Sequence, residues 1–411
     1  MIIYIDKTIA EHGDFTEQEE TMFTELACAH KRGYCFLCGH TLSIDKLKDK
    51  ISTYRTGIDN NHAELQSVFG EVETLVVITY GEKPDLPNAI AKNISLQNKS
   101  SELNEQTVDY IRVISVEQAI GYRLNEQCVF LGESTNDCAF YRLLAERYMH
   151  SIRDKIRGFA LSLKDENGGG QMTYKQLEKC VGTEHHLTLC LTDSDKKHGT
   201  SDKFVNKPGL GNTALSLEKA GKALEKDGLS TLFELLILDV HEAENLLPLS
   251  ILDDVVKHDA LDAQNGMAYL RLLQEKRMEL NKKATEQKDK DKEKYPEVML
   301  CYDIKKGVNV HKLKLDLEDT EKRKKVSKPL LAYWEEVIEV VGDDSIPGIA
   351  EKVLTYAIKH MDEITPSGYK KVNDYPIDEY LVDHWDTIGK KVFSWGIANK
   401  PMPTRPSSCS T

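Results

Sequence analysis

The chain has 411 residues, 40% hydrophobic and 29% charged, which is typical of a globular protein of two or three domains. Its formal net charge of −13 argues against a protein that coats DNA through a positive surface, but it leaves room for local basic patches or for a metal that screens phosphates. No run approaches the roughly 18 apolar residues of a membrane span, the N-terminus lacks signal-peptide features, and nine cysteines without a regular framework favour free thiols in a reducing cytoplasm.

Residues 1–122 predict a small N-terminal α/β region whose role the sequence does not indicate. Short apolar runs predict three strands, and capped amphipathic patterns predict two helices, the second capped by Ser43. The expected strands are 2–5, 34–38 and 73–80, and the expected helices are 16–32 and 43–55. The polar, Asn- and Ser-rich stretch 92–106 predicts a loop or linker.

Cys28, Cys35, Cys38 and His40 raise the alternative of a zinc site in this region, because they supply four thiolate or imidazole donors. Cys35 and Cys38, however, lie within an apolar strand-like run, and no second pair of ligands follows them as structural zinc sites require. The pattern therefore favours small buried cysteines on a strand.

From residue 123 onward, strands and helices alternate regularly. The expected strands are 128–131, 158–163, 187–191 and 232–238, and the helices between them are 136–149, 174–181 and 214–227. This alternation predicts a parallel sheet with flanking crossover helices over 123–310, including a helical insertion.

Beyond Pro248 the sequence is mostly helical. The expected strand is 298–303, and the expected helices are 261–287, 329–341, 346–361 and 379–397. All three tryptophans lie within 311–400, so we expect a mainly helical C-terminal region with its own core. The Pro- and Ser-rich tail 401–411 is expected to be disordered.

Carboxylates follow three of the predicted strands, and ligands of open α/β sheets gather at that edge. These residues are Glu133 and Asp137, Asp193 and Asp195, and Glu242 and Glu244. Carboxylates brought together repel unless a cation neutralises them, and hard oxygen ligands favour Mg²⁺, Mn²⁺ or Ca²⁺. Two such ions about 4 Å apart would activate water and stabilise the leaving oxygen of a phosphodiester. Each acid alone is equally explained as a helix cap or a turn former.

Three motifs resemble the TOPRIM domain of topoisomerases, bacterial primases and OLD (overcoming lysogenisation defect) nucleases. They are Gly132-Glu133 after an apolar strand, Asp193-x-Asp195 after another, and the block HEAENLLP at 241–248, which is similar to the (R/H)E-x-EN-(Y/L)-L-P block of OLD-type proteins. The resemblance covers roughly residues 127–252. Glycine and glutamate stand in reversed order relative to the VEG of many members, and the chain contains no P-loop.

The resemblance implies a nuclease that uses two Mg²⁺ or Mn²⁺ ions. Glu133, Asp137 and Asp193 would hold one ion, and Asp195, Glu242 and Glu244 would help to hold the second. It assigns catalysis to Glu133 and Asp193 with a late lysine near the scissile phosphate, for which Lys305 and Lys306, at the end of the predicted strand 298–303, are the nearest matches.

The expected function is therefore a DNA endonuclease or nickase, an effector of bacterial antiphage defence in the cytoplasm that works with a separate ATPase. The lysine- and arginine-rich segment 305–328 is a candidate contact for the DNA backbone. Oligomeric state stays open, and no membrane association is expected. Two alternatives remain: a catalytically inert TOPRIM-like scaffold, and a glycosyltransferase that uses Asp193 and Asp195 as its metal-binding pair.

Overall fold

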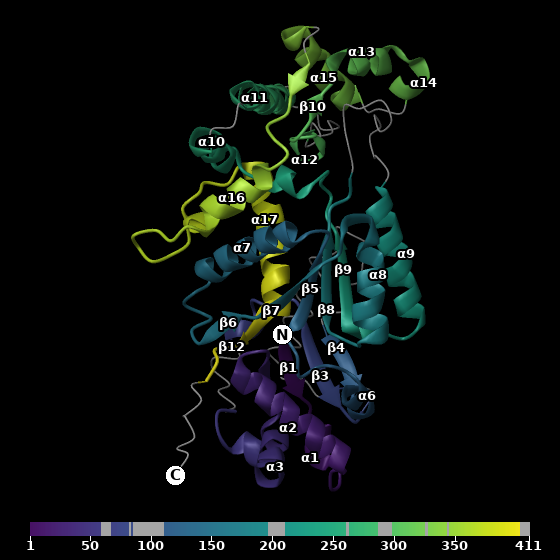
Figure 1. The fold of residues 1–411 in the computed structure, drawn as a ribbon, viewed down its shortest axis with the longest axis vertical. Coiled ribbons are helices and arrows are strands. Elements are labelled where there is room, and N and C mark those ends of the chain that lie inside the picture. The colour runs from purple at the N-terminus through teal and green to yellow at the C-terminus, as the bar shows by residue number, and fades with distance from the viewer. Residues whose placement is uncertain are drawn as a thin grey trace. The chain divides into compact units, whose positions relative to one another are not determined.

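The computed structural model describes residues 1–58, 67–81, 84, 111–195, 210–259, 263–286, 298–324, 328–342 and 345–402. The fold is α/β, with parallel sheets and many helices (Figure 1). Two compact units are formed, and neither is contiguous in sequence: unit 1 comprises Met1–Cys190, Lys219–Leu235 and Asp386–Thr411, and unit 2 comprises Leu191–Glu218 and Leu236–Trp385. The predicted linker 92–106 and residues 403–411 of the predicted tail lie outside the described residues.

A four-stranded parallel sheet forms the N-terminal part of unit 1, in the order β2 (Phe36–Gly39), β1 (Ile2–Ile5), β3 (Leu75–Thr79), β4 (Ile111–Ser115). Strands β1 and β3 are apolar on both faces and fully buried, as expected for central strands covered by helices. Strand β4 and the helix that follows it, α6 (Val116–Gly121), were not predicted.

Of the two predicted N-terminal helices, the structure confirms the first and differs from the second at both ends. Helix α2 (Glu17–Arg32) begins at a capping box between Thr16 and Glu19, and its bounds confirm the predicted helix 16–32. The predicted helix 43–55 is wrong at both ends, because α3 (Thr41–Lys50) is followed by a separate 3₁₀ turn, Ser52–Arg55. Ser43 is not its N-cap, because the residue lies within α3, and its hydroxyl donates to Asp6 O at 2.7 Å.

The second four-stranded sheet has the order β7 (Leu163–Asn167), β5 (Cys128–Gly132), β8 (Thr188–Thr192), β9 (Phe233–Ile237). Strand β5 pairs in parallel with β7 on one side and with β8 on the other. The chain leaves β5 toward β7 and leaves β8 toward β9, in the opposite direction, which places a topological switch between β5 and β8. The helices between the strands are α7 (Thr135–Ser151), α8 (Thr173–Leu177, extended by a π-helical turn) and α9 (Asn212–Lys226).

The predicted strand 158–163 is in fact two short strands with different partners. Strand β7 joins the sheet beside β5, whereas β6 (Phe159–Leu161) pairs antiparallel with β12 (Ile397–Asn399) near the end of the chain. The last part of α17 (Glu379–Gly396) and β12 therefore belong to unit 1.

A buried ion network fastens α17 to unit 1. Glu234 of β9 accepts from Trp395 Nε1 at 2.9 Å, and its two oxygens lie 3.3 Å from Arg112 Nη2 and 2.8 Å from Lys391 Nζ. Lys391 Nζ also lies 3.0 Å from Glu73 Oε2. Burial alone would raise the pKa of Glu234, but the positive charges of Lys391 and Arg112 outweigh burial and lower it. The five side chains come from four segments that are far apart in the sequence, so the network holds these segments together within unit 1.

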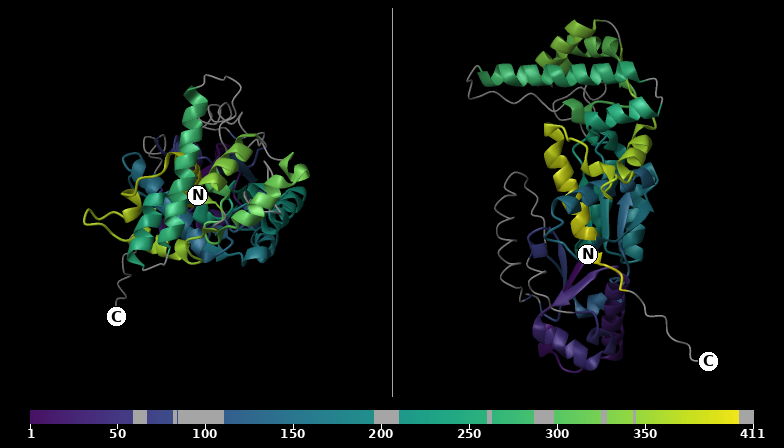
Figure 2. Two further views of the ribbon diagram at one scale, coloured as in Figure 1. Left: turned by 90° about the horizontal axis from the view of Figure 1, so that it is seen from above. Right: turned by 90° about the vertical axis from the view of Figure 1, so that its left-hand side faces the viewer.

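Unit 2 consists mainly of helices (Figure 2). Its elements after the 241–248 block are α10 (Leu249–His258), α11 (Gln264–Glu286), α12 (Val298–Cys301), β10 (Gly307–Val308), α13 (Val310–Glu318), α14 (Thr320–Arg323), α15 (Lys328–Val341), β11 (Ile346–Pro347) and α16 (Val353–Asp362). Helix α11 is one long helix and contacts α15. Within the described ranges no helix is long and apolar enough to cross a membrane.

Two predictions for this part are wrong. Residues 298–303 form the short helix α12 and a turn rather than a strand, and the predicted helix 346–361 starts only at Val353 because Ile346, which precedes Pro347, is extended in β11. The three tryptophans do not share one core: Trp334 and Trp385 belong to unit 2, and Trp395 belongs to unit 1.

Candidate metal centre

The Asp193-Ser194-Asp195 loop, which follows β8, is fastened to the segment that leads into the 241–248 block. Ser194 donates twice to Val240 O, from its backbone N at 3.0 Å and from its hydroxyl at 2.6 Å. Asp195 N donates to His241 O at 3.1 Å. Two of the predicted acidic segments therefore lie side by side in unit 2.

The backbone of Asp195 is held in an uncommon conformation. Its φ is 54°, in the left-handed region that costs a non-glycine residue about 1 kcal/mol or more. Gly211 packs directly against the side chain, since a Cβ there would lie 2.1 Å from Asp195 Oδ2, and Gly211 N donates to Ser194 O at 2.9 Å. The returning chain thus fixes the position of the Asp195 carboxylate.

The turn that carries Glu242 and Glu244 is organised by Asn245, which is buried. Its Oδ1 accepts from Glu242 N at 3.0 Å, and its Nδ2 donates to Met299 O and Tyr302 O, each at 2.7 Å. The asparagine of the 241–248 block therefore positions the two acids and ties them to the segment after α12, which carries Asp303 and Lys305. Trp385 Nε1 holds the end of the same turn by donating to Leu246 O at 2.7 Å.

Lys305 places its ammonium between the two glutamates. Nζ lies 3.1 Å from Glu242 Oε2 and 3.3 Å from Glu244 Oε1. Burial opposes the charged form of Lys305, but the two carboxylates outweigh it, so the pKa of Lys305 is raised above its usual value. For Glu244 burial outweighs the attraction of Lys305, so the pKa of this carboxyl is also raised. Lys305 thus reaches the acidic block from a turn before β10, not from a strand end as predicted. Lys306 does not reach it: its side chain is exposed, and its backbone N donates to Asp303 Oδ1.

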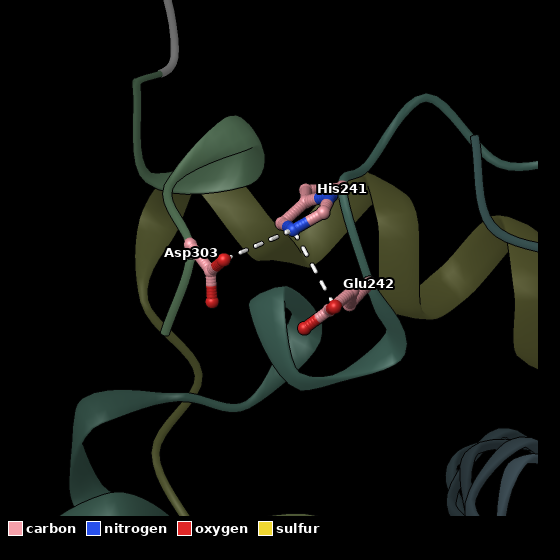
Figure 3. Close-up of side chains that lie close together, drawn as sticks. All are labelled: His241, Glu242 and Asp303. Carbon is pink, nitrogen blue, oxygen red and sulfur yellow. Dashed lines mark ion pairs between the residues drawn. The ribbon is translucent and has the colours of Figure 1, made fainter. Parts of the chain in front are cut away.

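His241 and Asp303 join the block, although the sequence did not single them out as ligands. His241 Nε2 lies 3.5 Å from Glu242 Oε1 and 3.8 Å from Asp303 Oδ2 (Figure 3). In the part of the chain that the structure describes, this is the only group of three or more His, Cys, Asp or Glu side chains whose ligand atoms all lie within 4.8 Å of one another. A histidine at the head of the 241–248 block was the one signal that the sequence offered.

Glu133 and Asp137 belong to unit 1. Asp137 forms a capping box with Ser134, accepting from Ser134 N at 2.8 Å, so at least one of its oxygens serves the start of α7. Glu133 follows β5 directly; its carbonyl accepts from Gly169 N and Gly170 N, and its carboxylate adds to burial and Cys138 in raising the pKa of Cys190 on β8. Glu133 therefore stands at the carboxyl end of β5, the strand beside the switch between β5 and β8. Convergence of all six acids stays a prediction.

The cysteine-rich segment behaves as a buried strand. Cys35 and Cys38 are buried, Cys38 Sγ contacts Ile3 O at 3.8 Å, and burial raises the pKa of Cys35 to about 12. In the part of the chain that the structure describes, neither cysteine belongs to a group of three or more His, Cys, Asp or Glu side chains whose ligand atoms lie within 4.8 Å of one another, so these residues form a buried strand and not a preformed zinc site.

No family model matches the sequence, and no curated protein or solved structure matches it either.

Proposed function

We propose that the protein is a divalent-metal-dependent phosphodiester hydrolase that acts on nucleic acid. The observation that carries the proposal is the set of hydrogen bonds from Ser194 and Asp195 to Val240 and His241, because it brings two acidic segments together at the end of one strand. Both acidic segments follow strands of the second sheet, β8 and β9, and ligands of open α/β sheets bind at the carboxyl ends of the strands.

The chemistry of the donors suits Mg²⁺ or Mn²⁺, and because no three of these carboxylates form a group within 4.8 Å among the described residues, the proposal requires that they converge when an ion binds. Asp193, Asp195, Glu242 and Glu244 offer hard oxygen donors, which are the ligands that these ions prefer. The ammonium of Lys305 between two of these carboxylates indicates that a cation is favourable at this position. When bound, a pair of such ions activates water and stabilises the leaving oxygen of the phosphodiester.

Lys305 has a defined part in this proposal. Because its pKa is raised, it stays protonated at neutral pH, so it stabilises negative charge and does not accept a proton from water. Its ammonium holds Glu242 and Glu244 in place before substrate binds, and it would attract the negative charge of a phosphate. Lys306 has no such role in the proposal.

The resemblance to OLD-type TOPRIM nucleases supports the finer assignment. On that basis we propose DNA as the substrate, an endonuclease or nickase as the activity, and a separate ATPase as a partner in antiphage defence. The resemblance also assigns Glu133 to the ion that Asp193 holds.

A catalytically inert scaffold is the second candidate, and one observation favours it. The contacts already present satisfy several of the acids, since Asp137 caps a helix and Lys305 neutralises Glu242 and Glu244. An assay of cleavage separates the two candidates.

The test is nicking of supercoiled plasmid by the full chain with Mg²⁺ or Mn²⁺, run beside thermal unfolding to check that each variant is folded. We expect Asp193→Asn and Glu133→Gln to abolish nicking. Asp253→Asn, which removes an exposed carboxylate of α10 paired with Arg271, is the matched control and should retain it. Nicking that survives Asp193→Asn would contradict the assigned centre, and a folded wild type that cleaves neither DNA nor RNA with either ion would favour the scaffold.

A further inference from the structure

His241 is a buried imidazole without a hydrogen bond. The residue is 1% exposed, and neither Nδ1 nor Nε2 has a hydrogen-bond partner among the described residues. Burying an unpaired polar group costs about 1–3 kcal/mol, so buried polar groups in folded proteins almost always find a partner. The backbone holds the ring in this position, because His241 N donates to Leu300 O at 2.7 Å while His241 O accepts from Asp195 N.

Nε2 of this ring is directed at two carboxylates (Figure 3). Its distances of 3.5 Å to Glu242 Oε1 and 3.8 Å to Asp303 Oδ2 are too long for good hydrogen bonds. They are close to what an ion requires: with metal–ligand distances of about 2.0–2.2 Å, two ligands of a tetrahedral site lie about 3.3–3.6 Å apart. The three side chains therefore surround a space of the right size for one metal ion.

Each carboxylate divides its two oxygens between a local contact and this space. Asp303 Oδ1 accepts from Lys306 N at 2.9 Å, and Oδ2 is the oxygen that faces His241. Glu242 Oε2 pairs with Lys305, and Oε1 is the oxygen that faces His241. These local contacts fix the orientation of both ligands, as supporting contacts do around metal sites in general.

We propose that His241, Glu242 and Asp303 bind a first-row transition-metal dication at a site that adjoins the proposed carboxylate centre and shares Glu242 with it, through Oε1, but does not include Asp193. An imidazole ligand suits Zn²⁺ and its neighbours, whereas Mg²⁺ and Ca²⁺ take oxygen ligands. A dication would also neutralise the two carboxylates, and three protein ligands leave one tetrahedral position open. The competing occupant is a proton on His241, which would form ion pairs with the same two oxygens.

The test measures metal binding without nucleic acid, so it does not depend on cleavage. Full-length protein freed of metal with a chelator is titrated with Zn²⁺ by calorimetry in excess Mg²⁺, and with Co²⁺ by absorption spectroscopy. We expect wild type to bind Zn²⁺ that Mg²⁺ does not displace, and to give Co²⁺ bands without the charge-transfer absorption of thiolate ligands. His241→Ala and Asp303→Asn should weaken this binding tenfold or more, by analogy with the effect of altering metal-site residues.

The chain offers a matched control in His186. It is also buried, and its Nε2 lies 3.6 Å from Glu184 and 3.8 Å from Glu126, but these residues do not form a cluster of converging ligand atoms. His186→Ala should therefore leave Zn²⁺ affinity unchanged. Asp193→Asn should also keep it while losing nicking, which separates this site from the proposed catalytic centre.

Either of two results would overturn the proposal: a wild type that takes up no Zn²⁺, or equal Zn²⁺ affinity in wild type, His241→Ala and Asp303→Asn. Unfolding curves recorded in chelator identify any variant that does not fold, and Asp303→Asn then carries the test if His241→Ala fails to fold.

Discussion

Replacing Lys305 by methionine removes one charge and keeps most of the apolar stem. In the folded protein the ammonium is shared by Glu242 and Glu244 at 3.1 and 3.3 Å, and the Glu244 side chain is only 8% exposed. Without Lys305, two carboxylates face each other with one of them buried. The variant therefore tests whether the acidic turn needs a cation in order to fold.

The expected loss follows from burial. Removing one partner of a buried ion pair costs about 3–5 kcal/mol, and the 21% exposure of the Lys305 side chain puts Lys305→Met at the low end, about 3 kcal/mol. The loss should depend on pH. Burial already raises the pKa of Glu244, and removing Lys305 raises it further. A carboxyl whose folded pKa exceeds its unfolded pKa loses stability as the pH rises through that interval, so the deficit should be larger at about pH 8 than at about pH 5.

Urea unfolding at the two pH values measures this, with divalent ions removed by a chelator. Lys276→Met is the control, because the Lys276 side chain is equally exposed, at 21%, but its partner Glu279 is 53% exposed; its unfolding midpoint should stay at the wild-type value. Adding Glu244→Gln to Lys305→Met should recover most of the lost stability. Mn²⁺ should stabilise Lys305→Met more than it stabilises wild type.

Two results would refute this reasoning. One is a Lys305→Met protein as stable as wild type at both pH values. The other is a double variant that is no more stable than Lys305→Met, because repulsion at Glu244 would then not be the cause of the loss.

Three further predictions concern other parts of the chain. Glu234→Gln leaves two buried cations without their shared anion, so it should lower the free energy of unfolding in urea by about 3–5 kcal/mol. Because the pKa of Glu234 is lowered in the folded protein, its stabilising contribution is present at neutral pH and is lost as the pH falls through the folded pKa. Gly211→Ala should displace Asp195 and reduce metal-dependent nicking at least tenfold, whereas Gly13→Ala, whose Cβ meets nothing within 4 Å, should not. Cys35, with a pKa of about 12, should react with a thiol reagent far more slowly in folded than in urea-unfolded protein, as mass spectrometry of labelled peptides would measure.

Strong local patterns were enough to predict much of the sheet architecture. The strands before Glu133 and Asp193 are fully buried apolar runs, and β5 and β8 form within a residue or so of their expected bounds. The acidic residues that follow them were found because a strand end followed by acids is a local signal. The prediction of a strand at 298–303 was wrong because the local signal there is ambiguous: a short apolar run fits a buried helical turn as well as a strand.

Contacts between distant residues could not be predicted in the same way. Three described α-helices, α10, α11 and α12, separate His241 from Asp303 in the sequence, and nothing in either local sequence indicates the other. The sequence motif contains Asn245 but does not indicate its role, which is to join the acidic turn to Met299 and Tyr302 through its side chain. Such contacts arise from tertiary packing, so only coordinates reveal them.

The return of α17 and β12 to unit 1 has a consequence for synthesis on the ribosome. Glu73 N donates to Ser394 Oγ, a residue 321 positions later in the chain. At about 5–20 residues per second, translation needs roughly 16–64 s to cover that interval. Until it ends, Glu73 lacks the Lys391 ammonium, and Glu234 and β6, once synthesised, lack Lys391 and the antiparallel strand β12, respectively. Unit 1 therefore completes its fold only after translation has passed all of unit 2, which makes the unfinished unit 1 a natural client for chaperones that bind exposed apolar surface.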